Sequence, residues 1–270
     1  MPTEDELVEL LPGIDGWLAG VERISARVLD AATSLRVISR NGVGADAVDT
    51  ASAHAKGIAI VLARGANSRG VAELAITLTL ASLRDLPNSN RVMHEGGWQR
   101  TLGREMPDIT LGIVGFGAIG RLVAQLGSAL GADILAYDPF SPVESGSGAT
   151  SATLAELFAS SDVITLHSPP SDDGSPLVTH ELLALVRRGS VLINTARSAL
   201  VHDDAVLDAL QSGQLKTYAV DAFDLEPPVL TAVLNHANTI LTPHLGGYTG
   251  ASTRRASELA VSNLLATLGE

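Results

Sequence analysis

The stretch that decides the fold is "TLGIVGFGAIGRLVAQLGSALGADILAYDPF", residues 110–140. A short apolar run leads into three glycines, Gly115, Gly117 and Gly120, and a helical pattern follows them directly. A second apolar run then ends at Asp138. A strand, a glycine-rich turn, a helix and an acid at the end of the next strand are typical of a dinucleotide-binding βαβ unit.

Each position in the glycine-rich turn has its own physical reason. Gly115 allows the tight turn, Gly117 lets the backbone approach a pyrophosphate, and Gly120 permits close packing of the helix against the strand. We expect the amides of Ala118 and Ile119, at the start of the helix, to face the same pyrophosphate. The alternative is a glycine-rich turn of some other α/β protein, which the strand, helix and acid around it make less favourable.

Asp138 indicates which dinucleotide binds. Its carboxylate would accept hydrogen bonds from the ribose hydroxyls and would repel a 2′-phosphate. No arginine follows in "YDPFSP", residues 137–142, to neutralise such a phosphate. The sequence therefore predicts NAD rather than NADP, with a simple turn acid before Pro139 as the alternative for Asp138.

Composition narrows the class of protein. A chain of 270 residues with 46% hydrophobic residues can fill two domains, at roughly 150 residues per domain. The net charge of −12, without a basic cluster, argues against nucleic-acid and anionic-membrane partners. The chain has no cysteine, so we expect no disulfide and no metal site. The start is unlike a signal peptide and the most apolar run, 75–83, is short, so we expect a cytoplasmic protein without membrane contact.

Strand patterns alternate with helical ones along most of the chain, which indicates an α/β fold with parallel sheet. The predicted strands are 16–20, 35–40, 58–63, 110–116, 133–138, 162–167, 190–195, 217–222 and 238–243. One longer helical pattern, at 69–96 and interrupted at Pro87, breaks this rhythm. We interpret it as a crossing between two domains.

Polar residues recur where predicted strands of the second half end. Arg197, Asp221 and His244 each follow or close an apolar run. Parallel sheets bind ligands at the carboxyl ends of their strands, so these three residues are candidates for one site. A surface cation, a cap and a loop histidine are the plainer interpretations of each residue taken alone.

Five ordered stretches then resemble the D-isomer-specific 2-hydroxyacid dehydrogenases, in their phosphoglycerate-dehydrogenase-like branch. They are "VISRNGVGADAVD" (37–49), "NSRGVAEL" (67–74), "VLINTARSALVHDDAVLDAL" (191–210), "AVDAFDLEPP" (219–228) and "TILTPHLGGYT" (239–249). The resemblance implies a Rossmann NAD-binding domain, 69–246, inserted into a flavodoxin-like substrate domain, 1–68 and 247–270. It also implies hydride transfer between NAD(H) and a small D-2-hydroxy or 2-keto acid. A homodimer is expected by the same resemblance, with its interface around 71–86 and the connector to Trp98.

The resemblance also implies catalytic roles. His244 is expected to exchange a proton with the substrate oxygen, and Glu226 to bond and orient its imidazole. Arg197 is expected to bind the substrate carboxylate and reacting oxygen with its guanidinium fork. Asp224, in the same acidic stretch as Glu226, is expected to be solvated.

Further contacts are expected on both ligands. Substrate would also meet the backbone amides around Val43 and Gly44, which resemble a carboxylate nest, and the side chain of Asn67. Asp221 is expected to face the nicotinamide carboxamide. The remaining residues expected along the cofactor are His167, Thr195, Ala196 and Gly246.

The chain departs from the family pattern at four places. A strand–helix–strand unit usually precedes the helix that matches "TEDELVELL", so we expect residues 1–270 to be poorly soluble or weakly active. A start codon placed too far downstream is the favoured explanation, and a shortened protein with an impaired substrate domain is the alternative. Ser198 replaces a glycine and is expected to crowd the cofactor or shift Arg197. His202 replaces an acid, and Ala19 replaces an arginine of the phosphoglycerate branch, which puts a phosphorylated substrate in doubt.

Two alternatives remain beside the dehydrogenase hypothesis. One is a catalytically impaired NAD(H)-binding sensor or co-repressor-like protein, which would bind the nucleotide without turnover. The other is a different Rossmann enzyme, which does not account for the order of the motifs around Arg197, Glu226 and His244. The other histidines are expected to be ordinary surface residues: His54, His94, His180, His202 and His236.

Overall fold

A computed structural model describes residues 1–141, 143–144, 146–171 and 173–269. The chain divides into two compact units. Unit 1 comprises Met1–Asn67 and Gly247–Glu270, and unit 2 comprises Ser68–Gly246, so unit 2 is inserted between two segments of unit 1. All strand pairs within the described residues are parallel, which confirms the predicted α/β class.

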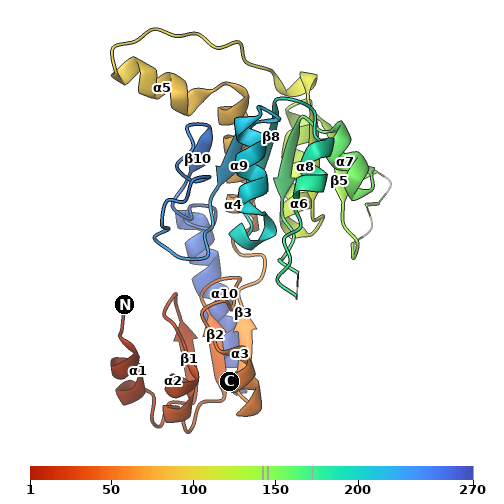
Figure 1. Ribbon diagram of the computed structural model, residues 1–270. Helices are drawn as coiled ribbons and strands as arrows, with labels where there is room; N and C mark the ends of the chain where they lie inside the picture. Colours follow the sequence, from red (N-terminus) through yellow and green to blue (C-terminus); the bar gives the residue numbers. More distant parts are fainter. Residues whose placement is uncertain (142, 145, 172, 270) are drawn as a thin grey trace. The chain divides into compact units, whose positions relative to one another are not determined.

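Unit 2 contains a seven-stranded sheet with the order β10-β9-β8-β7-β4-β5-β6 (Figure 1). Its strands are β4 (Thr110–Val114), β5 (Asp133–Tyr137), β6 (Thr150–Ser151), β7 (Val163–Leu166), β8 (Ser190–Asn194), β9 (Leu215–Val220) and β10 (Thr239–Leu241). β4 lies beside both β5 and β7, so the direction of winding reverses at β4. In open sheets of this kind the reversal point is where ligands bind.

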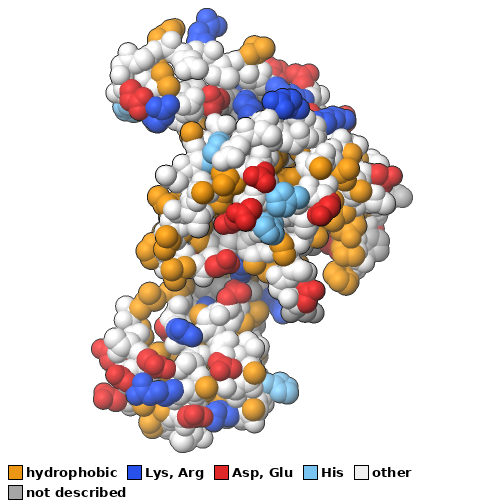
Figure 2. Space-filling model, viewed as in Figure 1, with side chains coloured by type: hydrophobic (Ala, Val, Ile, Leu, Met, Phe, Trp, Pro, Cys, Tyr) orange, Lys and Arg blue, Asp and Glu red, His pale blue; other side chains and the backbone are white. Residues whose placement is uncertain are grey.

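The helices of unit 2 cover both faces of this sheet. They are α4 (Ser68–Leu83), α5 (Leu86–His94), α6 (Ala118–Ala129), α7 (Leu154–Ser160), α8 (His180–Leu185) and α9 (Asp203–Gln211). The short 3-10 turns are η1 (Met106–Asp108) and η2 (Ser198–Leu200). On the face of the molecule seen in Figure 2, acidic, basic and hydrophobic side chains are intermixed over these elements.

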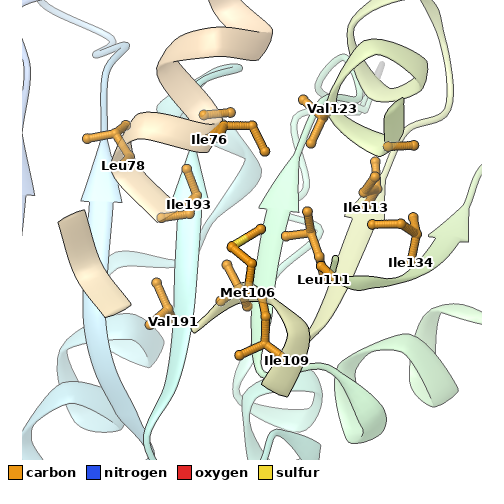
Figure 3. Packing of buried hydrophobic residues seen from close by; sticks show 14 of the residues in the cluster. Ile76, Leu78, Met106, Ile109, Leu111, Ile113, Val123, Ile134, Val191 and Ile193 are labelled. Carbon is orange, nitrogen blue, oxygen red and sulfur yellow. The ribbon is translucent and has the colours of Figure 1, made fainter. Parts of the chain in front are cut away.

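Two apolar clusters hold the layers together. Side chains of α4 and α6 pack on one face of the sheet, against residues such as Leu111 and Ile193 (Figure 3). Side chains of α7, α8 and α9 pack on the other face, against residues such as Ile164 and Leu192. Because Leu192 and Ile193 are successive residues of β8 that serve opposite clusters, the strand must be apolar on both faces. Full burial of such a side chain stabilises the fold by about 1.5–3 kcal/mol.

The last strand is shorter than predicted. The sequence predicts a strand over 238–243, whereas β10 ends at Leu241. Thr242 still donates its N–H to the Val220 carbonyl at 3.1 Å, and its hydroxyl donates to the Asp221 carboxylate at 2.6 Å. Pro243 follows and has no N–H to continue the ladder.

The long helical pattern at 69–96 is two helices. α4 ends at Leu83 and α5 begins at Leu86, with Asp85 between them at a left-handed φ of 51°. Pro87 stands in the first turn of α5, where its missing N–H costs nothing. α5 has no buried residue, and Figure 1 shows it with the segment after it beside the main body of unit 2.

Unit 1 contains a three-stranded sheet in the order β1-β2-β3. The strands are β1 (Gly16–Ala19), β2 (Val37–Arg40) and β3 (Ala59–Leu62), and the helices are α1 (Glu4–Leu10), α2 (Ala26–Ala31), α3 (Thr50–Ala55) and α10 (Gly250–Leu268). α10 contacts all three strands, and the Ser39 hydroxyl donates to the Ala260 carbonyl at 2.7 Å. Across the described residues, no helix is both long and apolar enough to cross a bilayer.

Candidate functional site

The glycine-rich turn after β4 leaves space for a ligand at one position. Gly115 has a φ of 94°, and a Cβ there would lie 2.6 Å from the His167 carbonyl carbon. A Cβ on Gly120 would lie 2.0 Å from the Gly115 oxygen, so this position needs glycine for packing. A Cβ on Gly117 would meet no atom within 4 Å. Gly117 therefore borders open space at the start of α6.

The start of α6 presents free backbone donors to that space. Ala118 is the first helical residue, and Gly117 caps the helix without a side chain. The amides of Ala118, Ile119 and Gly120 lie in the first helical turn, where no intrahelical acceptor exists. Such amides and the positive end of the helix dipole favour a phosphate group.

Asp138 follows β5 and anchors the same turn. Its Oδ2 accepts a hydrogen bond from Phe116 N at 2.7 Å, and its Oδ1 accepts from Phe140 N and Ser141 N at 2.8 and 2.9 Å. Four lone-pair positions on a carboxylate leave room for a further donor such as a ribose hydroxyl. Sequence reasoning missed Arg121, whose guanidinium donates to the Phe116 carbonyl and the Ser141 hydroxyl at 2.9 and 2.8 Å.

Three buried polar atoms near the ends of β7 and β8 have no partner within the described structure. They are His167 Nδ1, Ser168 Oγ and Thr195 Oγ1. Buried polar groups are normally hydrogen-bonded, so their neighbourhood at the winding reversal fits a polar ligand such as a dinucleotide. Burial lowers the pKa of His167 to about 3, and its Nε2 lies 2.9 Å from the Thr165 hydroxyl. The His167 imidazole is therefore neutral, and its Nδ1 has no hydrogen-bond partner among the described residues.

Asp221, at the end of β9, is 1% exposed and fixes the chain after β10. Its Oδ1 accepts from Thr242 Oγ1 and Leu245 N at 2.6 and 2.7 Å, and its Oδ2 accepts from Gly246 N at 2.9 Å. A Cβ on Gly246 would lie 3.1 Å from that Oδ2, which keeps the approach close. Asp221 therefore has a structural function in addition to the cofactor contact expected for it.

His244 and Glu226 lie in direct contact. Nδ1 of His244 is 2.7 Å from Oε1 of Glu226, and both side chains are about half exposed. The His244 backbone has a left-handed φ of 51°, and its N–H donates to the carbonyls of Asp221 and Thr242 at 2.9 Å. This conformation is uncommon for a residue with a side chain and aims the imidazole at its carboxylate. The other ring nitrogen is left to face a ligand.

Arg197 occupies the turn that follows β8. The Arg197 carbonyl accepts from Nδ2 of Asn194 at 2.8 Å, and Oδ1 of Asn194 accepts from Ala196 N at 3.1 Å. Nη1 of Arg197 donates to the Ala196 carbonyl at 2.7 Å. Sequence reasoning missed Asn194, although a fully buried amide closing an apolar strand is itself a signal of a shaped turn.

Ser198 and Asp224 contact each other at this edge. The Ser198 hydroxyl donates to Oδ1 of Asp224, and the expectation that Ser198 crowds the cofactor or shifts Arg197 stays a prediction. Asp224 is exposed, as expected, but it is engaged with Ser198 rather than solvated only. The two residues therefore form a contact between the loops after β8 and β9.

The residues expected to bind substrate in unit 1 lie at the carboxyl end of its sheet. The Val43 and Gly44 amides, in the loop after β2, donate no hydrogen bond to the described part of the chain. Asn67 Oδ1 is buried without a partner. Ala19 is fully buried, and sequence reasoning missed Arg40, which is 7% exposed, bonded to the Gly44 carbonyl at 3.3 Å and left with an unpartnered Nη1. Burial lowers the pKa of Arg40, against the charges of nearby acids.

His180 and His202 are exposed, as expected. Their rings are tilted relative to each other with 5.4 Å between centroids, and Nε2 of His180 lies 3.2 Å from Oδ2 of Asp208. Figure 2 shows histidine side chains gathered with acids over α8 and α9. Within the described residues, no group of three or more His, Asp or Glu side chains could hold a metal ion.

Comparison with known proteins agrees with this geometry. The profile of the family described as "D-isomer specific 2-hydroxyacid dehydrogenase, NAD binding domain" matches residues 76–246. The D-3-phosphoglycerate dehydrogenase of Mycobacterium tuberculosis is 36% identical over 275 residues, which cover 100% of this chain and 52% of that protein. The hydroxypyruvate reductase of Thermotoga maritima is 33% identical over 272 residues, which cover 98% of this chain and 89% of that protein.

A solved structure is similar over nearly the whole chain. D-lactate dehydrogenase from Aquifex aeolicus, complexed with NAD and lactic acid, superposes with a TM-score of 0.84 at 27% identity. The match covers 99% of this chain and 86% of that one. The chain spans about half the length of the mycobacterial relative that it matches.

Proposed function

Because the chain belongs to the D-isomer-specific 2-hydroxyacid dehydrogenase family, we propose that it is an NAD-dependent dehydrogenase of a small D-2-hydroxy acid. The observation that carries the proposal is the 2.7 Å contact between Nδ1 of His244 and Oε1 of Glu226. A histidine steadied by a carboxylate at a strand end is the arrangement that proton transfer to a substrate oxygen requires. Arg197 lies in the turn after β8, and β9 separates β8 from β10, the strand that precedes His244.

His244 is the proposed acid in keto-acid reduction and the proposed base in hydroxy-acid oxidation. Its Nδ1 is held by Glu226, so Nε2 is the atom that exchanges the proton with the substrate oxygen. The Glu226 carboxylate fixes the orientation of the imidazole ring. Bound NAD(H) supplies or accepts the hydride at the substrate carbon.

Arg197 is proposed to bind the substrate carboxylate. A guanidinium offers two parallel N–H donors that match a carboxylate, and a lysine cannot reproduce this geometry. The free amides of Val43 and Gly44 and the side chain of Asn67 are proposed as further carboxylate and hydroxyl contacts. We propose that unit 1 contributes these substrate contacts, and that unit 2 binds the cofactor and contributes Arg197 and His244.

The cofactor is proposed to lie along the strand ends of unit 2. Its pyrophosphate would meet the amides at Gly117, Ala118 and Ile119, and its adenosine ribose would meet Asp138. Its nicotinamide end would approach the groups around Asp221 and Thr195. The remaining proposed contacts are His167, Ala196, Gly115, Gly120 and Gly246.

The substrate class is proposed to be a short 2-keto or 2-hydroxy acid. Relatives at 33–36% identity carry the names hydroxypyruvate reductase and D-3-phosphoglycerate dehydrogenase. The buried Ala19 offers no cation for a phosphate, whereas Arg40 is a cation with one vacant N–H. Hydroxypyruvate and 3-phosphohydroxypyruvate are therefore the first pair to compare.

The test is oxidation of NADH with a panel of keto acids: glyoxylate, pyruvate, hydroxypyruvate and 3-phosphohydroxypyruvate. We expect turnover that falls sharply in His244→Gln and in Arg197→Ala. His54→Gln, an exposed histidine on α3, is the matched control and keeps the wild-type rate. Activity that survives both site variants contradicts the mechanism, and NADH binding without turnover on any acid supports the sensor alternative.

Most of the expected interface segment 71–86 lies in α4, whose apolar side chains are largely buried within unit 2, so we propose a homodimer through the connector, α5 and the segment after it. This segment exposes Leu86 at 59%, Met93 at 54%, Trp98 at 79% and Leu102 at 97%, more apolar surface than a free helix needs. A second copy of the same segment would cover it symmetrically. Light scattering on a sizing column tests this, with Trp98→Glu and Leu102→Glu expected to give a monomer. A wild-type monomer contradicts it.

A further inference from the structure

The side chains of Ser198 and Asp224 connect two loops at the carboxyl edge of the seven-stranded sheet. The Ser198 hydroxyl donates a hydrogen bond to Oδ1 of Asp224. Ser198 directly follows Arg197 in the turn after β8, and Asp224 lies two residues before Glu226 in the loop after β9. The bond therefore joins the turn that carries the guanidinium to the loop that carries the partner of His244.

Each of these loops is otherwise anchored on its own side. The turn is fixed to β8 by Asn194, whose Nδ2 donates to the Arg197 carbonyl at 2.8 Å. The loop is fixed toward His244, because Oε1 of Glu226 accepts from Phe223 N at 3.2 Å and contacts the imidazole. The hydrogen bond between Ser198 and Asp224 therefore sets the distance between the Arg197 turn and the Glu226 loop.

The turn and the loop both pack into one apolar cluster, through Leu200 and Phe223 among others, but this packing is incomplete at the rim. Between the turn and the loop lies an open cavity of about 310 Å³. Its walls include Ala199 and Val201 on the turn side and Phe223 and Leu225 on the loop side, with Ser198 and Asp224 among the lining residues. A gap lacks the dispersion contacts that hold close-packed elements together. The hydrogen bond at its rim therefore bears more of the positioning than it would in a packed core.

Electrostatics around Asp224 make the serine hydroxyl important. Asp203, at the start of α9, lines the same cavity, and its pKa is raised by burial and then by the charges of Asp224 and Asp204. The Asp224 carboxylate thus lies near that of Asp203, which Asp204 also affects. Without the donor from Ser198, like-charge repulsion favours movement of Asp224 and its loop away from the turn.

We propose that Ser198 and Asp224 are positioning residues that hold the Arg197 turn at a fixed spacing from the Glu226–His244 pair. The proposal rests on the proposed function for the identity of the three groups that it positions. The proposal gives Ser198, which replaces the usual glycine, a positioning role. It also predicts that binding of the substrate carboxylate depends on the spacing between the two loops. The proposed pyrophosphate site, at the start of α6, lies on a different loop.

The experiment compares Ser198→Ala and Asp224→Ala with the wild-type protein by turnover and by calorimetry. Because Arg197 binds the carboxylate, we expect KM for the keto acid to rise about tenfold, with KM for NADH within twofold. Oxamate, an unreactive carboxylate, is the binding probe for the NADH complex, and its Kd is expected to rise by the same factor.

Conservative variants and a double variant separate positioning from general structure. Ser198→Thr keeps the hydroxyl and is expected to restore wild-type KM. The double variant is expected to lose no more than either single variant, because both remove one interaction. Ser175→Ala is the matched control, since it removes a serine–aspartate bond of 2.6 Å in another exposed loop and is expected to change nothing.

The outcomes distinguish this inference from the proposed function. Wild-type KM and wild-type oxamate affinity in Ser198→Ala overturn the inference while leaving the function intact. Additive losses in the double variant, or an equal change in the KM for NADH, also overturn it. A wild-type protein that binds oxamate in a Ser198-dependent way but turns over no keto acid keeps the inference and overturns the function. A wild-type protein that binds no oxamate overturns the inference as well.

Discussion

The two edges of the seven-stranded sheet use polar residues in opposite ways. At the amino edge, Asp162 accepts from Arg104 Nη1 and Thr110 N, each at 2.8 Å, and lies 3.6 Å from Arg187. At the carboxyl edge, His167, Ser168 and Thr195 each keep a buried polar atom without a partner. Three of the four such atoms described in unit 2 lie at the carboxyl edge, the exception being Ser161 Oγ.

The difference between the two edges distinguishes polar groups that stabilise the fold from polar groups that a ligand would complete. Closed ion pairs satisfy their own charges and need nothing further, so they stabilise the folded chain. Vacant buried donors and acceptors cost free energy unless a ligand completes them. His244, with its left-handed φ of 51°, also lies at the carboxyl edge. Substitutions at the two edges should therefore affect different measurements.

The largest effect is expected from His244→Asn. Asparagine tolerates the left-handed backbone, so the fold is kept while the imidazole is removed. We expect kcat to fall by roughly 10²–10⁴-fold, the usual contribution of a general acid–base. Steady-state kinetics and a thermal melt of the same preparation measure the two quantities. Asp85→Asn, at the other left-handed non-glycine residue, is the control and leaves kcat unchanged. A melt lowered along with kcat contradicts a purely functional role.

The next effect separates two glycines of one motif. Gly120→Ala places a Cβ 2.0 Å from the Gly115 oxygen, so we expect a loss of stability of about 3 kcal/mol or more. Gly117→Ala meets no protein atom, so its melt should stay near wild type. Its Kd for NADH is nevertheless expected to rise at least about tenfold, because the methyl group enters the pyrophosphate space. Urea unfolding measures the stability of each variant, and fluorescence titration measures its Kd for NADH. A stable Gly120→Ala, together with an unstable Gly117→Ala that keeps its NADH affinity, contradicts this division of roles.

A smaller effect concerns the pH dependence of stability at the carboxyl edge. Burial lowers the pKa of His167 to about 3, so the unfolded chain binds a proton at this residue from about pH 6.5 downward while the folded chain does not. Stability is therefore lost as the pH falls below 6.5, by about 2 kcal/mol at pH 5. His167→Asn should flatten this slope in urea unfolding between pH 5 and 7. His54→Asn should leave the pH dependence of stability unchanged. An unchanged slope in His167→Asn contradicts the assignment of this pH dependence to His167.

These contrasts also define what the sequence could predict. The strand ends at Arg197, Asp221 and His244 were found from the end of each apolar run, because hydrophobic patterning fixes where a buried strand stops. The glycine motif was found from its spacing. Both signals are local, and both reappear in the structure at the expected strand ends.

Contacts between distant residues could not be predicted in this way. The Ser198–Asp224 bond spans 26 positions, and the Arg104–Asp162 bond spans 58. A single sequence holds no signal for such pairs when each partner is an ordinary polar residue in a loop. The bond from the Thr242 hydroxyl to Asp221 is of the same kind, because its partners lie 21 positions apart.

The smallest effect is expected at the amino edge, from Asp162→Asn. Burial alone would raise the pKa of Asp162, but hydrogen bonds from Arg104 and Thr110 and the nearby arginine charges lower it overall. A lowered folded-state pKa adds stability above the unfolded value of about 4, and this stability is lost as the pH falls through the folded value. The arginines are about half exposed, so solvent screening limits the loss in Asp162→Asn to about 1–2 kcal/mol at pH 7.

The window below pH 4 distinguishes Asp162 from His167. Melting curves from pH 3 to 7 should show wild type and Asp162→Asn converging as the pH drops below about 4, because the wild-type carboxyl is then protonated. Asp133→Asn is the matched control, since this exposed acid begins β5 at the same edge and has no such partners among the described residues. Its Tm should follow that of the wild type. If Asp162→Asn changes the Kd for NADH while leaving the melt unchanged, the amino edge belongs to the ligand site and the contrast between the two edges fails.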